Sequence, residues 1–278
     1  MASITDCVVE GLKYPFNDIK KLLGLGVLFA LANLLSMGFS LKSFDVFRAS
    51  AHLVEETNAH LSSVQFSQLP AGDIYIAIAL FIVSFIVALF IMGYQYDVIR
   101  FSIDKREDLP GFGDIVGMFV KGVKYFIVAL AYNIIPIIVF VGGLALVQDS
   151  SAVTLVFLIS MVLFIIAFFL LIMALNNMVA HDDIRKAFDF REIIDNIANL
   201  GWGKYIGIII FTLIVYMIVM VAVSFILGII LITFVTIINN QAIWVSAFMA
   251  IIEGLFIYSY SALFYNRVCG SVYRESIK

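Results

Sequence analysis

Residues 207–230 read GIIIFTLIVYMIVMVAVSFILGII, an apolar run in which no charged side chain occurs. A helix needs about 20 mostly apolar residues to cross the hydrocarbon core of a bilayer, and this run is long enough. Strands of a membrane barrel alternate apolar and polar residues, and the run shows no such alternation. The sequence therefore predicts a transmembrane helix and an all-α membrane protein.

Composition gives the same prediction for the whole chain of 278 residues. Hydrophobic residues make up 63% of it and charged residues 13%, and the mean hydropathy is +1.08. A soluble domain has about 45–50% apolar and about 25% charged residues, so this chain lacks the polar surface of a water-soluble globule. The net charge of −3 argues against a nucleic-acid partner, since such partners require a concentrated basic patch.

Six stretches are long and apolar enough to span the membrane, and we expect them to form a helical bundle. The fifth is over-long, so it must tilt, project beyond the bilayer or break near Gly228. Of the 17 Lys and Arg residues, all but Lys42 and Arg48 fall on one side of this arrangement. Positively charged loops stay cytoplasmic, which predicts a multi-pass protein of the cell (cytoplasmic) membrane with both termini inside. The expected spans are residues 22–41, 73–96, 124–147, 152–176, 205–238 and 242–265.

A short amphipathic segment precedes each odd-numbered span. Each has Phe, an acidic residue two positions later, Ile next, and an apolar residue seven after the Phe, which is the spacing of one helix face. We expect a threefold repeat within one transmembrane domain, residues 1–278. Its units cover about 12–100, 108–186 and 187–278, each a cytoplasmic interfacial helix followed by a transmembrane hairpin, with an external loop at 42–72. The repeated residues are Phe16, Asp18, Ile19, Phe112, Asp114, Ile115, Phe190, Glu192 and Ile193.

Three motifs carry a resemblance to a known family. They are YPFNDIKKLLGLGVLFALANLL at 14–35, GYQYDVIR at 93–100 and LPGFGDIVGMFVKGVKYFIVALAYNIIP at 109–136. The chain resembles an uncharacterised polytopic membrane-protein family common in methanogenic archaea, catalogued as a domain of unknown function. The resemblance implies an archaeal cytoplasmic membrane and brings no activity, substrate or site.

Glu253 is the candidate intramembrane polar residue, because it falls near the middle of the sixth span. A charge at the bilayer centre costs about 2.5–3.5 kcal/mol, so its carboxyl should be neutral, hydrogen-bonded or turned to a polar interior. Ser246 and Tyr260 lie seven residues before and after it and should share its face. Asn133, beside Pro136 in the third span, could bond Glu253. The alternative is that both polar residues serve helix packing alone.

Other candidate chemistry is weak. His52, Glu56 and His60 have helical spacing but no fourth ligand, so no metal site is predicted. Cys7 and Cys269 lie outside any metal-binding pattern and should be inert thiols. The sequence contains no nucleotide-binding or hydrolase motif, so we expect no cofactor and no enzyme activity.

Two functions remain open. The first is a non-catalytic membrane protein that organises the membrane or docks a partner through its inner-surface helices. The second is a transporter or channel for a small solute, lipid or proton that uses Glu253. Expected partners are membrane lipids together with a protein partner or a second copy of the chain.

Overall fold

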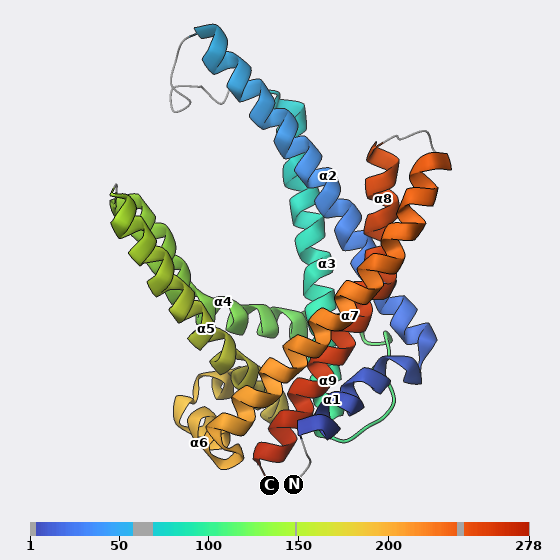
Figure 1. Cartoon of the computed structure of the whole chain (residues 1–278), viewed down its shortest axis with the longest axis vertical. Helices are drawn as coiled ribbons and strands as arrows, with labels where there is room; N and C mark the ends of the chain where they lie inside the picture. Colours follow the sequence, from blue (N-terminus) through green and yellow to red (C-terminus); the bar gives the residue numbers. More distant parts are fainter. Residues whose placement is uncertain (1–3, 58–68, 148, 238–241, 278) are drawn as a thin grey trace. The chain divides into compact units, whose positions relative to one another are not determined.

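The computed structural model describes residues 4–57, 69–147, 149–237 and 242–277, and every element within them is helical (Figure 1). In chain order the elements are α1 (Ile4–Lys13), the 3-10 helix η1 (Tyr14–Asn17), α2 (Ile19–Thr57), α3 (Ala71–Ile103), α4 (Ile115–Leu146), α5 (Ser150–His181), the 3-10 helix η4 (Ile184–Phe188), α6 (Phe190–Leu200), α7 (Trp202–Ile237), α8 (Ala242–Ile252), the π-helix η5 (Glu253–Tyr258) and α9 (Ser259–Ser276).

Six segments of these helices are long and apolar enough to cross a membrane, which confirms the predicted number. They are Ile19–Leu53, Ala71–Ile103, Ile115–Leu146, Ser150–His181, Trp202–Ile232 and Ile243–Ser276. Large apolar side chains are exposed along them, as expected of a multi-pass membrane protein.

The observed helices differ from the predicted spans mainly in length. Residues 42–57, expected in an external loop, continue α2, and α7 runs unbroken through Gly228. The predicted possibility of a break near Gly228 is therefore excluded. The physical reason is that a glycine within an apolar helix lowers helix propensity but does not by itself interrupt the backbone hydrogen bonds. Of the three amphipathic segments, the third is a helix of its own, α6, whereas Ile19 and Ile115 begin α2 and α4.

Two compact units divide the chain. Unit 1 comprises residues 1–22, 92–220 and 260–278, and unit 2 comprises residues 23–91 and 221–259. The boundaries fall inside α2, α3, α7 and the last span, so each unit is built from parts of several long helices.

Unit 1 has a core rich in tyrosine. Tyr96, Tyr205 and Tyr273 are fully buried together with methionines of α5 and with Ile193 and Ile197 of α6. Each hydroxyl has a partner: Tyr205, for example, donates to the carbonyl of Phe169 at 2.6 Å. Buried tyrosines thus supply apolar area while their polar atoms stay satisfied.

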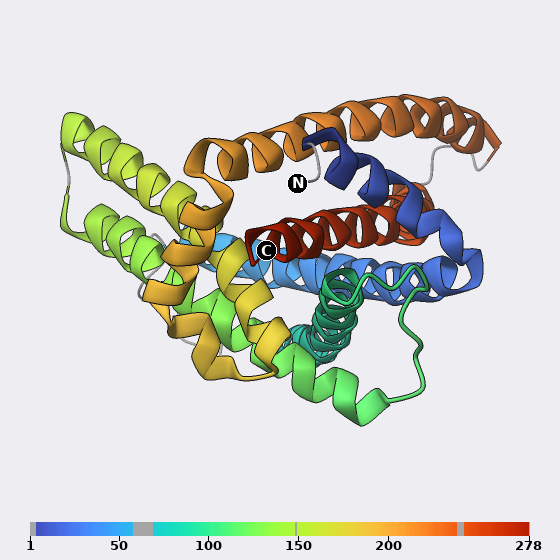
Figure 2. The same cartoon turned by 90° about the horizontal axis from the view of Figure 1, so that it is seen from below.

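Within unit 1, α4 and α5 pack against each other, and the C-terminal half of α4 and the N-terminal half of α5 lie side by side in both views (Figures 1 and 2). Figure 1 also shows that α4 is bent. Pro136 lies inside α4 and has no backbone N–H for the carbonyl of Tyr132, which is the common cause of such a bend.

Unit 2 is held by close backbone approach. A Cβ at Gly254 would overlap the backbone of Ala30 in α2, and a Cβ at Gly26 would lie 2.6 Å from the carbonyl oxygen of Leu255. Small residues allow the backbones of membrane helices to approach this closely. The resulting van der Waals contact matters because apolar side chains gain little free energy by leaving lipid.

Candidate functional sites

Glu253, the predicted intramembrane residue, is the first residue of the π-helix η5. A π-helix shifts backbone hydrogen bonding from i→i+4 to i→i+5, and single π turns often occur at functional positions. The Glu253 side chain is half-buried in unit 2 and has no hydrogen bond or ion pair among the described residues. The sequence shows no signal for this change of helix type.

Asn33 of α2 makes a contact between helices close to the π-helix, and this contact was not predicted from the sequence. Its side-chain Nδ2 donates to the carbonyl of Ala250 at 3.0 Å, across the two helices. Ala250 lies three residues before the π-helix, so this hydrogen bond ties α2 to the turn that leads into it. An asparagine within the first apolar span was the available signal.

The π-helix alters the predicted alignment of Ser246, Glu253 and Tyr260. Their seven-residue spacing assumed 3.6 residues per turn, which does not hold between Glu253 and Tyr258. Ser246 is exposed on α8. Tyr260 belongs to unit 1, where its hydroxyl donates to the carbonyl of Leu12 at 3.2 Å.

Asn133 bonds within its own helix. Its Nδ2 donates to the carbonyl of Ala129, four residues earlier, at 2.8 Å. The side-chain hydrogen bond of Asn133 and the proline at 136 thus lie in neighbouring turns of α4. Asn133 belongs to unit 1 and Glu253 to unit 2, so the expected bond between them stays a prediction.

The acidic residues of the repeated segments act largely as helix caps. The Asp18 carboxylate accepts from the backbone N–H of Lys21 at 3.1 Å, and the Asp114 carboxylate accepts from that of Gly117 at 2.8 Å. Before α6 the cap is Asp189, whereas Glu192 pairs with Lys186 at 2.6 Å. Such caps satisfy backbone donors that a helix start leaves free, which accounts for the acidic position in the first two segments.

The three repeated phenylalanines each lie beside a tyrosine in unit 1. Ring centroids are 5.6 Å apart for Phe16 and Tyr260, 4.8 Å for Phe112 and Tyr94, and 5.9 Å for Phe190 and Tyr132. These distances are those of favourable aromatic pairs.

The apolar faces of the same segments are used differently. Ile193 and Ile197 of α6 are fully buried in the core of unit 1, whereas Ile115, Phe190 and Ile19 are exposed.

A second polar site lies in unit 1, where α1 packs on α9 (Figure 1). The Glu10 carboxylate pairs with the guanidinium groups of Arg267 and, at 3.1 Å, of Arg274. Arg267 stacks 4.5 Å above the Tyr14 ring and donates to the carbonyl of Arg106, so residues far apart in sequence meet here. Its side chain is 4% exposed, which makes the ion pair with Glu10 necessary.

A third polar group surrounds Asp182, at the end of α5. Its carboxylate accepts from the Tyr96 hydroxyl at 2.6 Å and from Lys124 Nζ at 3.1 Å, and Arg100 lies 3.8 Å away. The hydrogen bond from Tyr96, followed by that from Lys124, lowers the pKa of the Asp182 carboxyl. In the sequence this place shows only a cluster of charged residues after the fourth apolar stretch.

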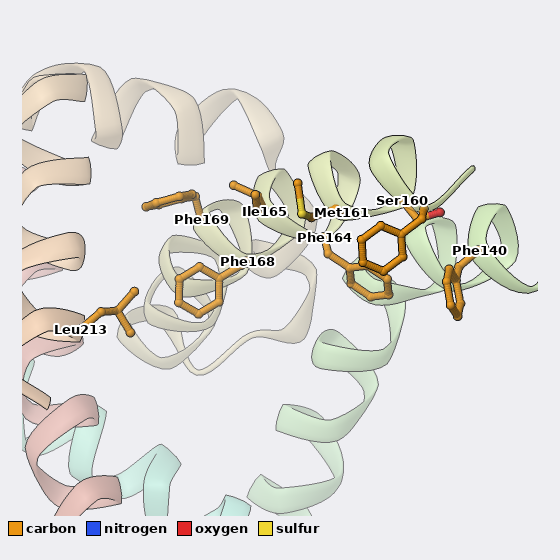
Figure 3. Close-up of a pocket in the computed structure, with 9 residues that line it drawn as sticks. Phe140, Ser160, Met161, Phe164, Ile165, Phe168, Phe169 and Leu213 are labelled. Atoms are coloured by element: carbon orange, nitrogen blue, oxygen red, sulfur yellow. The ribbon is translucent and has the colours of Figure 1, made fainter. Parts of the chain in front are cut away.

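An apolar pocket of about 550 Å³ is lined by α4, α5 and α7 within unit 1 (Figure 3). Its walls are mostly aromatic, and Ser160 is the polar residue among them. The Ser160 hydroxyl is buried and has no hydrogen-bond partner among the described residues.

The structure describes the two cysteines and only some of the residues with metal-ligand spacing. His52 is exposed on α2, His60 lies outside the described residues, and the side chain of Glu56 is not described. Cys7 and Cys269 are both free and buried. Burial, followed by the nearby Glu10 charge, raises the pKa of the Cys7 thiol, which keeps this thiol protonated and unreactive.

Comparison with known proteins identifies the family to which this chain belongs. No curated protein and no solved structure matches the chain. A family model described as a protein of unknown function, DUF4013, matches residues 76–232, from within α3 to within α7. That match covers more than half of the 278 residues, and the chain therefore belongs to the DUF4013 family of proteins of unknown function.

Proposed function

We propose that this protein is a non-catalytic membrane protein that docks a partner at the polar end of unit 1. The observation that carries the proposal is the ion-paired arrangement of Glu10, Arg267 and Arg274, joined to the 104–114 connection by Arg267. These contacts fix α1 and α9 as a rigid polar surface, whereas the apolar pocket of unit 1 is almost without polar groups.

The proposed orientation places this polar end in the cytoplasm. Lys105, Arg106 and Arg185 of unit 1 lie between the long apolar helices, in segments that the positive-inside rule assigns to that side. An archaeal cytoplasmic membrane and a threefold repeat of interfacial helix and hairpin are part of the same proposal. Reporters fused after residues 60 and 150 should both appear outside, and a cytoplasmic signal from either would contradict it.

Exposed apolar residues of unit 1 form the other part of the proposed docking surface. Val116 at the start of α4 and Ile194 on α6 are exposed next to charged neighbours, and neither packs into the core of unit 1. Their partner would be a protein or a second copy of this chain, with membrane lipid bordering both. No nucleic acid is proposed.

Photo-crosslinking in intact membranes tests the docking function. A photoreactive residue at Val116 or at Ile194 should yield one protein adduct of defined mass. The matched control is Ile218 of α7, which is exposed in the apolar part of unit 1 and should give lipid adducts only. Identical adducts at all three positions would contradict docking.

Proton or solute transport is the second candidate, and one observation favours it. A carboxyl without a partner among the described residues begins a π-helix inside an apolar span. In vesicles loaded with a pH-sensitive dye, Glu253→Gln should abolish proton flux while Ser246→Ala leaves it intact. Equal flux in parent and Glu253→Gln would remove Glu253 from any transport mechanism.

A further inference from the structure

A polar cavity of about 560 Å³ opens at the ion-paired end of unit 1. Its walls come from α1, η1, the connection after α3, and α9. The volume falls within the range of small-molecule sites, which is roughly 300–1,000 Å³. The lining residues are Glu10, Lys13, Tyr14, Asn17, Lys105, Glu107, Arg267 and Arg274.

The charge of this lining is positive. Four basic side chains face two acidic ones, and Glu10 is already engaged by both arginines. Lys13 and Lys105 are exposed and make no ion pair within the described part of the chain. With the Glu107 carboxylate counted, the four basic and two acidic side chains leave the lining a net charge of two positive.

The two arginines also have unused hydrogen-bond donors. The Nε atoms of Arg267 and Arg274 are buried and lack a partner among the described residues. Arg267 is held by Glu10, by the carbonyl of Arg106 and by the Tyr14 ring, so its guanidinium is already oriented. Donors oriented in advance lower the entropic cost of binding an anion.

The backbone places one of the free lysines. Lys105 has φ +60°, a left-handed conformation rare outside glycine, and it lies in the turn after α3, where its amide donates to the carbonyl of Ser102 at 3.3 Å. This turn sets the position of Lys105 at the cavity, where lysine acts as a point charge toward phosphate.

We propose that this cavity binds a phosphate-bearing anion. Arginine forks and lysine charges together are the usual recognition chemistry for phosphate oxygens, and the positive excess matches a dianion. The phosphate could come from a lipid headgroup or from a free phosphorylated molecule, because the cavity lies at an end of apolar helices that are able to span a membrane. The site shares Glu10, Arg267 and Arg274 with the polar surface proposed above for docking, but phosphate binding does not require a docked partner.

The test uses the full chain in nanodiscs of phosphatidylcholine, with inorganic pyrophosphate titrated by calorimetry at low ionic strength. The variant combines Lys13→Gln with Lys105→Asn, since asparagine tolerates the left-handed backbone. Its matched control combines Lys20→Gln with Arg185→Gln, which removes two exposed charges outside the cavity. In a second arm, phosphatidylglycerol is added to the nanodiscs and the unfolding temperature is measured.

Saturable pyrophosphate binding that weakens about tenfold in the variant but not in the control would show a site for free phosphate. A rise in unfolding temperature with phosphatidylglycerol that the variant loses and the control keeps would show a headgroup site. If parent and variant respond equally in both arms, or neither probe has an effect, the proposal is wrong.

Discussion

Unit 1 and unit 2 are stabilised in different ways. In unit 1, buried tyrosines, ion pairs and caps hold the helix ends, and Arg267 shows how deep these polar contacts reach. In unit 2, Gly26 and Gly254 bring two backbones into contact, and Asn33 adds one hydrogen bond between helices.

The contrast follows from the surroundings of each contact. Helices that leave lipid for one another gain little from apolar burial, so unit 2 depends on close fit. The helix ends of unit 1 carry charges, and charged groups that become buried must be paired. Single substitutions should therefore act through steric overlap in unit 2 and through lost charge compensation in unit 1.

The largest effect is expected at Gly254. Gly254→Ala places a Cβ against the backbone of Ala30, which cannot move as a flexible side chain could. We expect the free energy of unfolding to fall by about 3 kcal/mol, measured by detergent-induced loss of helicity.

Gly228→Ala is the control for that substitution. It lies in α7, also in unit 2, and a Cβ there would meet nothing within 4 Å. This variant should be neutral or more stable by up to about 1 kcal/mol, because alanine favours the helix. Equal losses at the two glycines would refute close fit as the basis of unit 2.

A smaller loss is expected from Glu10→Ala, which tests unit 1. The substitution leaves Arg267 buried without its carboxylate, and we expect about 2 kcal/mol of destabilisation in the same assay. Asp108→Asn removes one partner of the exposed pair with Arg106 and should cost less than about 1 kcal/mol. If the free energy of unfolding falls by the same amount in both variants, the ion pair at α1 stabilises the protein no more than an exposed surface pair does.

Asn33→Leu should cost about 1 kcal/mol, since interhelical hydrogen bonds in membranes are worth little more. Asn133→Leu removes a bond within a single helix of unit 1 and should be close to neutral. Measuring both compares a bond between helices with one inside a helix. A larger loss for Asn133→Leu would reverse the assigned roles.

Apart from the control variants, the smallest effect is expected at Asp182, whose side chain is 54% exposed. Its pKa in the folded state is lowered, so its stabilising contribution is present above the unfolded value of about 3.9 and is lost as pH falls through the folded pKa. Asp182→Asn should cost about 0.5 kcal/mol at pH 6, a figure reduced for solvent screening. Unfolding at pH 6 and at pH 3 should show this difference shrinking, and a constant difference would exclude titration of Asp182.

The six apolar helices were predictable because lipid imposes a simple requirement of length and hydropathy. The shared acidic positions of the repeated segments were also recognised, although Asp18 and Asp114 proved to be caps. The π-helix at Glu253 was not predictable, since the residues EGLFIY are compatible with an ordinary α-helix. Asn33 was visible in the sequence, but its acceptor on Ala250 was not.

The polar end of unit 1 shows the same limit. Glu10, Arg267 and Arg274 are ordinary charged residues in the sequence, where they read as water-facing ends of helices. Their ion pairs form only because α1 packs against α9, and no local sequence pattern predicts that packing.

Composition and periodicity alone thus established a helical membrane protein and the number of its apolar helices, because hydrocarbon excludes unpaired backbone groups along every span. Tertiary structure alone decided which polar atoms meet. Glu10 with Arg267 and Asn33 with Ala250 are pairs between distant parts of the chain. Such pairs arise only when helices pack, since hydrogen bonds and ion pairs depend on distances of a few ångströms rather than on sequence spacing.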